Sequence, residues 1–129
     1  MHYSQTSDET LVTLTLTGDA DAYEELVKRY QTQVLIAANA IMHNTYLAED
    51  AAQDAFVSAW MKLNILREPS KYGTWVCRIA KNCARNMLLR MREYISFDLL
   101  EKYSESNGTS IMVGQMDPRR GIYANTKLF

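Results

Sequence analysis

The fold is decided by Thr45-Tyr-Leu-Ala-Glu-Asp-Ala-Ala-Gln-Asp-Ala-Phe-Val-Ser-Ala-Trp60 and by Tyr72-Gly-Thr-Trp-Val-Cys-Arg-Ile-Ala-Lys-Asn-Cys-Ala-Arg-Asn-Met-Leu-Leu-Arg-Met-Arg92. Both segments show the spacing of apolar residues that is typical of amphipathic helices. The first is rich in alanine and carries carboxylates and amides, whereas the second is basic. Residues 64–71 between them contain a proline and lose the helical period, which predicts a loop. Two neighbouring helices of opposite charge indicate two partners, one a protein and one a polyanion.

Two further helices are expected before these segments. Residues 20–42 place apolar side chains at spacings of three and four along one continuous stripe. Residues 6–16 fit either a short helix or a strand, and we favour a helix because no partner strand follows in the sequence. Gly18 ends this helix and Asp19 caps the next, while Thr45 is the expected N-cap of the third. We therefore predict an all-α domain: a compact three-helix bundle with a short N-terminal helix.

The pattern changes after the last basic helix, which we expect to begin near Pro69 or Ser70 and to end near Arg92. Residues 97–103 fit one more short helix, residues 104–110 resemble a linker, and Asp117-Pro118 marks a break. We accordingly expect one domain over residues 1–97. Residues 98–129 are expected to form a linker or truncated tail that is flexible.

The alanine-rich helix has two faces of different chemistry. Its apolar side chains recur on one side and are expected to face the core: Leu47, Ala51, Ala55, Phe56, Ala59 and Leu63. Asp50, Gln53 and Asp54 lie at i, i+3 and i+4 on the other side, so they share one surface. Taken alone, this triplet fits an ordinary solvated face better than a binding site.

The positive charge of the chain is concentrated in one segment. Residues 1–59 hold nine acids and two bases, and residues 60–92 hold eight bases and one acid, although the net charge is only −1. One face of the basic helix carries four cations with an amide between them: Arg78, Lys81, Asn82, Arg85 and Arg92. Since a solvated face usually mixes charges of both signs, this stripe favours contact with nucleic acid. Trp75 falls in the apolar stripe of the same helix, where packing in the core is at least as good an explanation.

Several classes of protein are disfavoured by what the sequence lacks. No apolar run approaches the roughly 18 residues that span a membrane, and residues 1–9 do not resemble a secretion signal, so we expect a cytoplasmic protein. Cys77 and Cys83 are too far apart on one helix for an easy disulfide and are expected to be reduced. There is no glycine-rich phosphate loop, no nucleophile with a general base and no zinc-ligand spacing. We therefore expect no enzyme activity, no metal and no cofactor.

With these segments in view, the chain resembles region 2 of the extracytoplasmic-function (ECF) sigma factors, the promoter-recognition subunits of bacterial RNA polymerase. Gly18-Asp-Ala-Asp-Ala-Tyr-Glu-Glu-Leu-Val-Lys-Arg-Tyr30 is similar to the opening segment of that family. Residues 48–60 resemble the helix that binds core polymerase. Trp75-Val-Cys-Arg-Ile-Ala-Lys-Asn82 is similar to part of the segment that reads the promoter minus-ten element.

The resemblance implies a role for each surface. Asp50, Gln53 and Asp54 would dock on the coiled coil of the largest subunit of core RNA polymerase. Residues 64–71 and the start of the basic helix would capture a flipped base of the melted non-template strand. The residues assigned to promoter DNA are Ser70, Lys71, Tyr72, Arg78, Lys81, Asn82 and Arg85, with Tyr72 offering a stacking face, Asn82 a base contact and the cations phosphate contacts. An anti-sigma factor would cover the same surfaces.

The chain also departs from the family pattern. Asn86 stands where many members carry Asp, and no helix-turn-helix domain for the minus-thirty-five element follows Asp117-Pro118. The chain is thus expected to be a fragment or a stand-alone form. The resemblance implies the function of an ECF-type sigma factor that binds core polymerase and recognises and melts the minus-ten element. The alternatives are a polymerase-binding regulator without promoter specificity and an unrelated helical nucleic-acid-binding module.

Overall fold

The computed structural model describes residues 2–107, with side chains up to residue 102, and confirms the all-α fold. Among these residues there is no strand. The elements are α1 (Asp8–Leu16), α2 (Ala20–Met42), α3 (Thr45–Met61), the 3-10 turns η1 (Leu63–Ile65) and η2 (Pro69–Lys71), and α4 (Tyr72–Asn107). The short N-terminal helix and the three principal helices are therefore all present, although α4 begins at Tyr72 and not near Pro69 or Ser70, which lie in η2. None of the described helices is both long and apolar enough to span a bilayer.

The helix boundaries follow from local capping chemistry. The side chains of Ser7 and Asp19 cap α1 and α2 by accepting hydrogen bonds from backbone N–H groups, and Gly18 takes the positive φ of 105° that ends α1. His43 adopts a left-handed conformation after α2. Asn44, and not the expected Thr45, caps α3, with its side-chain oxygen 3.1 Å from the Leu47 nitrogen. That prediction was wrong by one residue because two adjacent residues suit an N-cap.

The end of α4 corrects a second expectation. The helix was expected to stop near Arg92, but it continues through residues 97–103 to Asn107. No proline or glycine interrupts the segment between Gly73 and Asn107, so nothing local forces the helix to end where the apolar period weakens. Residues 108–129, including Asp117-Pro118, lie outside the described residues.

The chain divides into two compact units at residue 85, inside α4. The described part of the second unit is the helical segment 86–107, which carries an ion pair between Lys102 and Asp98 at 3.3 Å. Its exposed apolar side chains are Met91, Tyr94, Ile95, Phe97 and Leu99.

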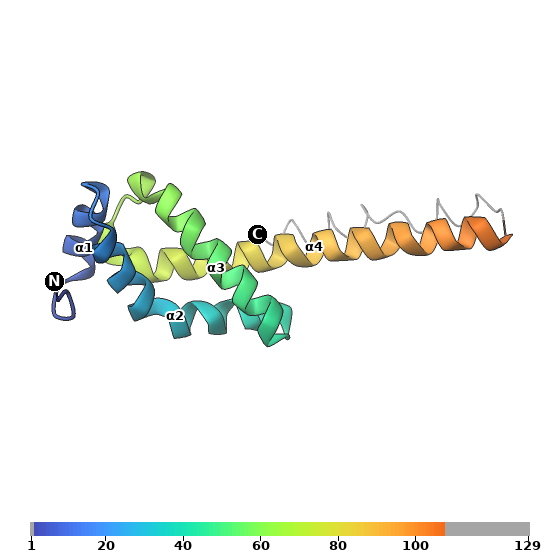
Figure 1. The fold of residues 1–129 in the computed structure, drawn as a ribbon, viewed down its shortest axis with the longest axis horizontal. Helices are drawn as coiled ribbons and strands as arrows, with labels where there is room; N and C mark the ends of the chain where they lie inside the picture. The colour runs from blue at the N-terminus through green and yellow to red at the C-terminus, as the bar shows by residue number, and fades with distance from the viewer. Residues whose placement is uncertain (1, 108–129) are drawn as a thin grey trace. The chain divides into compact units, whose positions relative to one another are not determined.

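In the first unit, α1, α2, α3 and the beginning of α4 surround one core (Figure 1). Small residues dominate the inner side of α3, where Ala48, Ala51, Ala52, Ala55 and Ala59 are buried. Alanine lets helix backbones approach closely, which brings α3 against α2. The core is completed by larger buried side chains from all parts of the unit: Leu11, Val12, Leu26, Val34, Leu63, Tyr72 and Val76.

A polar network joins α1 to α2 beside this core. Arg29 donates a hydrogen bond to Asp8 at 2.9 Å and another to Glu25 at 3.1 Å. The Tyr30 hydroxyl donates to the second carboxylate oxygen of Asp8. Asp8 therefore holds two side chains of α2 at once, which fixes the position of the Tyr30 ring.

Gly73 allows α4 to pack against that fixed ring. A Cβ atom at Gly73 would lie 2.3 Å from Cε1 of Tyr30 and 2.7 Å from Cζ. Such distances are far below van der Waals contact, so no larger residue fits without moving α4 or the tyrosine.

We expect Gly73→Ala to lower the free energy of unfolding by about 1 kcal/mol or more. Alanine favours a helix over glycine by about 1 kcal/mol, so net destabilisation means that the clash with Tyr30 outweighs helix propensity. Urea unfolding followed by circular dichroism measures the difference. Thr74→Ala, at the neighbouring exposed position, is the control, and a Gly73→Ala variant as stable as the wild type would contradict the packing described.

The raised pKa of Tyr30 predicts that the protein loses stability at alkaline pH. Burial, together with the hydrogen bond to Asp8, raises the pKa of Tyr30 to about 12. Because the pKa of an unfolded tyrosine is about 10, the contribution of Tyr30 is complete below pH 10 and is lost as the pH rises towards 12. We expect Tyr30→Phe to flatten the fall in unfolding free energy over this range. The exposed Tyr46→Phe is the control, and an equal effect of both variants would refute the assignment.

Candidate functional site

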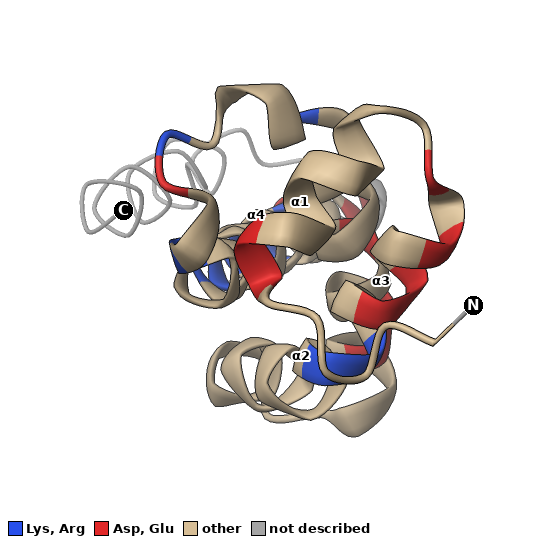
Figure 2. Ribbon diagram, turned by 90° about the vertical axis from the view of Figure 1, so that its left-hand side faces the viewer, with Lys and Arg blue, Asp and Glu red and all other residues tan. Residues whose placement is uncertain are grey.

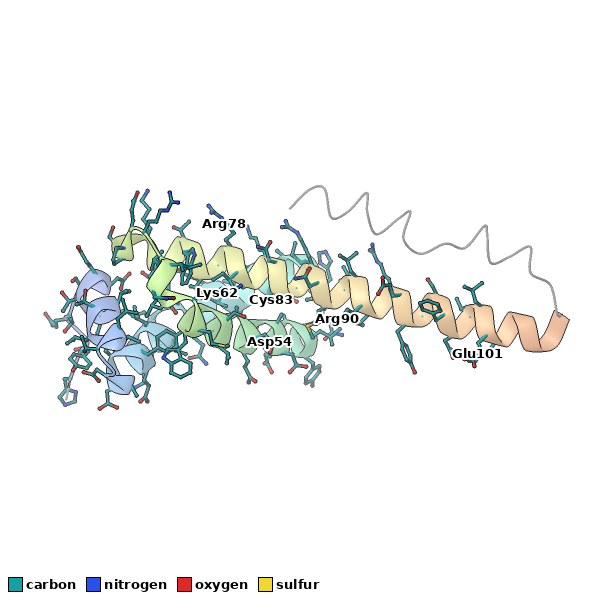
Figure 3. The ribbon with its side chains drawn as sticks, turned by 90° about the horizontal axis from the view of Figure 1, so that it is seen from above. Asp54, Lys62, Arg78, Cys83, Arg90 and Glu101 are labelled. Atoms are coloured by element: carbon teal, nitrogen blue, oxygen red, sulfur yellow. The ribbon has the colours of Figure 1, made fainter. Side chains whose placement is uncertain are left out.

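The acidic triplet of α3 lies on an outward-facing surface. Asp50, Gln53 and Asp54 are all exposed, while the alanines on the other side of the helix are buried. The inward alanines thus determine which way the carboxylates point. In Figure 3, Asp54 on α3 and Arg78 on α4 lie at opposite edges of the bundle. The helix brings these three side chains together as the sequence predicts.

The same surface of α3 extends beyond the triplet and includes large apolar side chains. Tyr46 is 82% exposed at one end, and Val57, Trp60 and Met61 are 56%, 58% and 72% exposed at the other. Helical spacing places them on the side that carries the triplet, and we call the whole set the α3 face: Tyr46, Asp50, Gln53, Asp54, Val57, Trp60 and Met61. Exposed apolar groups next to charged ones are typical of protein interaction sites. Sequence reasoning missed these four residues, although their spacing from Asp50 was available as a signal.

A hollow of about 450 Å³ lies beside the α3 face, between α2 and α3. Gln53 contributes to both features, so the hollow is continuous with the triplet. Its walls are mainly apolar with three polar side chains: Val27, Gln31, Leu35, Glu49, Ala52, Gln53 and Phe56. It offers space for an apolar side chain of a bound protein.

The cations of α4 form the second surface. Arg78, Lys81 and Asn82 are exposed, and Arg85 is half-buried. We call these four residues the α4 basic face. No acid occurs in α4 before Glu93, and Figure 2 shows Lys and Arg on α4 but Asp and Glu on α1 and α3. The segregation of charge predicted from the sequence is therefore also a segregation in space.

The loop before α4 forms a pocket next to this face. The loop contains the 3-10 turns η1 and η2, and the volume of the pocket is about 320 Å³. We call it the loop pocket; it is lined by Ile65, Leu66, Arg67, Glu68, Lys71, Thr74, Trp75 and Arg78. Ser70 and Lys71 are exposed, and Lys71 makes only a long, exposed ion pair with Glu68 at 3.9 Å, which contributes little to stability. Apolar and aromatic walls combined with cations suit a nucleotide base and its phosphate.

Tyr72 does not belong to either surface. Its side chain is fully buried, and its hydroxyl donates a hydrogen bond to the Tyr23 hydroxyl at 3.1 Å. Its ring packs between those of Tyr23, Tyr30 and Trp75, with centroids 6.2, 5.7 and 6.1 Å away. Burial raises the pKa of Tyr72, which keeps the phenol neutral. The expectation that Tyr72 offers a face for base stacking is wrong, because helix geometry turns it inward with Val76 and Ala80.

The sequence of the chain is similar to that of a known protein family. Residues 26–93, just over half of the chain, match the family model described as Sigma-70 region 2. The RNA polymerase sigma-H factor of Pseudomonas aeruginosa is 37% identical over 67% of this chain and 45% of its own length. The ECF RNA polymerase sigma-E factor of Escherichia coli K12 is 35% identical over 66% of this chain and 44% of its own length. The ECF RNA polymerase sigma factor SigW of Bacillus subtilis is 34% identical over 50% of this chain and 35% of its own length. The chain spans less than half the length of these relatives, and no solved structure matches it significantly.

Proposed function

Because the chain belongs to the sigma-70 region 2 family, we propose that it acts in transcription initiation as region 2 of an ECF-type sigma factor. In this role it binds core RNA polymerase through the α3 face and the opened minus-ten element through the loop pocket and the α4 basic face. The observation that carries the proposal is the separation of two chemically different surfaces, on α3 and on the beginning of α4, within one compact unit. The role requires binding alone and no covalent chemistry by this chain.

The composition of the α3 face supports a protein partner with basic character. Asp50 and Asp54 supply two carboxylates at the centre, and Tyr46, Val57, Trp60 and Met61 supply apolar area on both sides of them. Aromatic residues and methionine are enriched at protein interfaces, and complementary charges set orientation and association rate. A helical coiled coil with exposed cations, such as the one expected on the largest polymerase subunit, fits this elongated surface.

The loop pocket and the α4 basic face support single-stranded DNA as the second partner. A base extruded from the duplex needs a pocket with apolar walls, and its phosphates need cations at the rim. The loop pocket supplies the side chains of Leu66 and Trp75 for the base and those of Lys71 and Arg78 for the phosphate. Asn82 is exposed on α4, where its amide can donate to and accept from a base edge.

The polymerase proposal predicts that Asp50→Ala/Asp54→Ala loses most of its affinity for core RNA polymerase. Removing charged groups from the centre of an interface leaves their partners unpaired, and we expect the dissociation constant to rise at least about tenfold. Co-purification of the full chain with core polymerase, followed by titration, measures the change. Glu9→Ala/Glu24→Ala removes two exposed acidic charges outside α3 and is the matched control. If the wild type and both variants bind core polymerase equally well, the α3 face is not part of the polymerase interface.

The DNA proposal predicts a steep dependence of binding on salt. For a single strand, each phosphate contacted contributes about −0.7 to the slope of log K against log salt concentration. We expect Arg78→Ala/Lys81→Ala to reduce the slope for a short oligo(dT) strand by about 1.4, because two phosphate contacts are lost. Fluorescence anisotropy at several salt concentrations gives the slope. The control, Lys28→Ala/Lys102→Ala, removes two exposed cations elsewhere and should leave the slope unchanged. If the slope is also unchanged in the Arg78→Ala/Lys81→Ala variant, the α4 basic face does not contact DNA.

A further inference from the structure

A second hollow lies next to the α4 basic face, between α2 and α4, and encloses about 500 Å³. We call it the α2/α4 groove; it is lined by Tyr30, Gln33, Ser70, Gly73, Thr74, Cys77, Arg78 and Lys81. Its size lies within the range of sites that bind small organic groups. Neither the family match nor the resemblance to ECF sigma factors assigns Gln33 a role.

The groove and the loop pocket share one wall. Thr74 and Arg78, one helical turn apart on α4, line both hollows, so they form a ridge between them. Figure 3 shows the Arg78 side chain extending outward from α4. A cation on the ridge between two hollows is well placed to meet the phosphate that joins two consecutive nucleotides, each with its base in one hollow.

The walls of the groove suit an anionic ligand. Arg78 and Lys81 are exposed cations at its rim, and Ser70, Thr74 and Gln33 add hydrogen-bonding groups. Among the described residues, no carboxylate lines the groove. Asp8, which lies behind Tyr30, is paired with Arg29 at 2.9 Å. Burial and the Asp8 hydrogen bond raise the pKa of Tyr30 to about 12, so this wall is uncharged at neutral pH.

The floor of the groove is closely packed. Gly73 brings the α4 backbone against the Tyr30 ring, and any side chain at this position would fill the space between them. The ring itself is held by Asp8 and packs on Tyr72 at 5.7 Å between centroids. A preformed site loses less conformational entropy when a ligand binds than a site that must first be ordered.

We infer that the α2/α4 groove is a second subsite for single-stranded DNA, which holds the nucleotide next to the one in the loop pocket, with Gln33 of α2 contacting its base. This inference rests on the proposed function, because the strand must first be bound at the loop pocket. Gln33 is exposed, and its amide both donates and accepts hydrogen bonds, as contact with a base edge requires. The strand therefore passes over the Arg78 ridge and contacts α2 as well as α4.

Gln33→Glu tests the subsite through charge. The substitution preserves size but places a carboxylate in the groove, and repulsion of the phosphate should weaken binding of a short oligo(dT) strand by about fivefold. Gln31→Glu is a closely matched control: it makes the same change two residues away on α2, at an exposed position that lines the hollow between α2 and α3. We expect the affinity of this control to stay within about twofold of the wild type.

Cysteine protection tests occupancy of the groove directly. Cys77 lines the groove, whereas Cys83 does not, and trypsin separates them into the peptides 72–78 and 82–85. Burial raises the pKa of the Cys77 thiol, so alkylation by iodoacetamide is run at mildly alkaline pH. We expect saturating oligo(dT) to slow alkylation of Cys77 at least about threefold, with a much smaller change at Cys83.

The outcomes separate the subsite from the function on which it rests. In one outcome the wild type binds oligo(dT) and Arg78→Ala weakens that binding, but Gln33→Glu has no more effect than Gln31→Glu and Cys77 is not protected. The second subsite is then wrong, and the proposed function stands. If the wild type does not bind the strand, the second subsite and the DNA-binding part of the proposed function are both wrong. Selective weakening by Gln33→Glu together with selective protection of Cys77 establishes the second subsite.

Discussion

Burial of the Tyr72 side chain at the start of α4 is the constraint on which the candidate binding surfaces of α4 depend. The ring fills the space between Tyr23, Tyr30 and Trp75, and its hydroxyl is bonded to that of Tyr23. Because the position of Tyr72 on the helix is fixed, residues on the opposite side of that turn must face outward. Burying a large aromatic side chain contributes about 2 kcal/mol or more, which makes this orientation of α4 strongly preferred over a rotated one.

The second requirement is that two charged surfaces remain apart on a small unit. The acids of α3 and the bases of α4 would neutralise each other if the two helices faced one another through these residues. They do not, because each helix turns small or apolar side chains inward: alanines in α3, and Tyr72, Val76 and Ala80 in α4. The acidic and basic surfaces are consequently both available to partners. We propose that this arrangement lets one unit hold a protein and a nucleic acid at the same time.

Patterns with a strong local cause could be predicted from the sequence. The apolar stripe of α2, the outward triplet of α3 and the cations of α4 all follow from helical spacing, and the structure places Asp50, Gln53, Asp54, Arg78, Lys81 and Asn82 at exposed positions. Tyr72 was misjudged because an aromatic residue beside a predicted loop suits a base as well as a core, and only the tertiary contacts decide. The length of α4 was underestimated because a helix can continue where apolar periodicity lapses. The α2/α4 groove depends on Gly73 meeting Tyr30, a contact between residues distant in the sequence that periodicity cannot reveal.

We propose that polymerase and DNA occupy different faces of the same unit. Hydrogen–deuterium exchange of the full chain tests it most directly, with the chain alone, with core RNA polymerase, and with a short single strand. We expect core polymerase to slow exchange mainly in α3, residues 45–61, and the strand to slow exchange mainly in residues 64–85. Protection of the same peptides by both partners, or of neither segment, would contradict it.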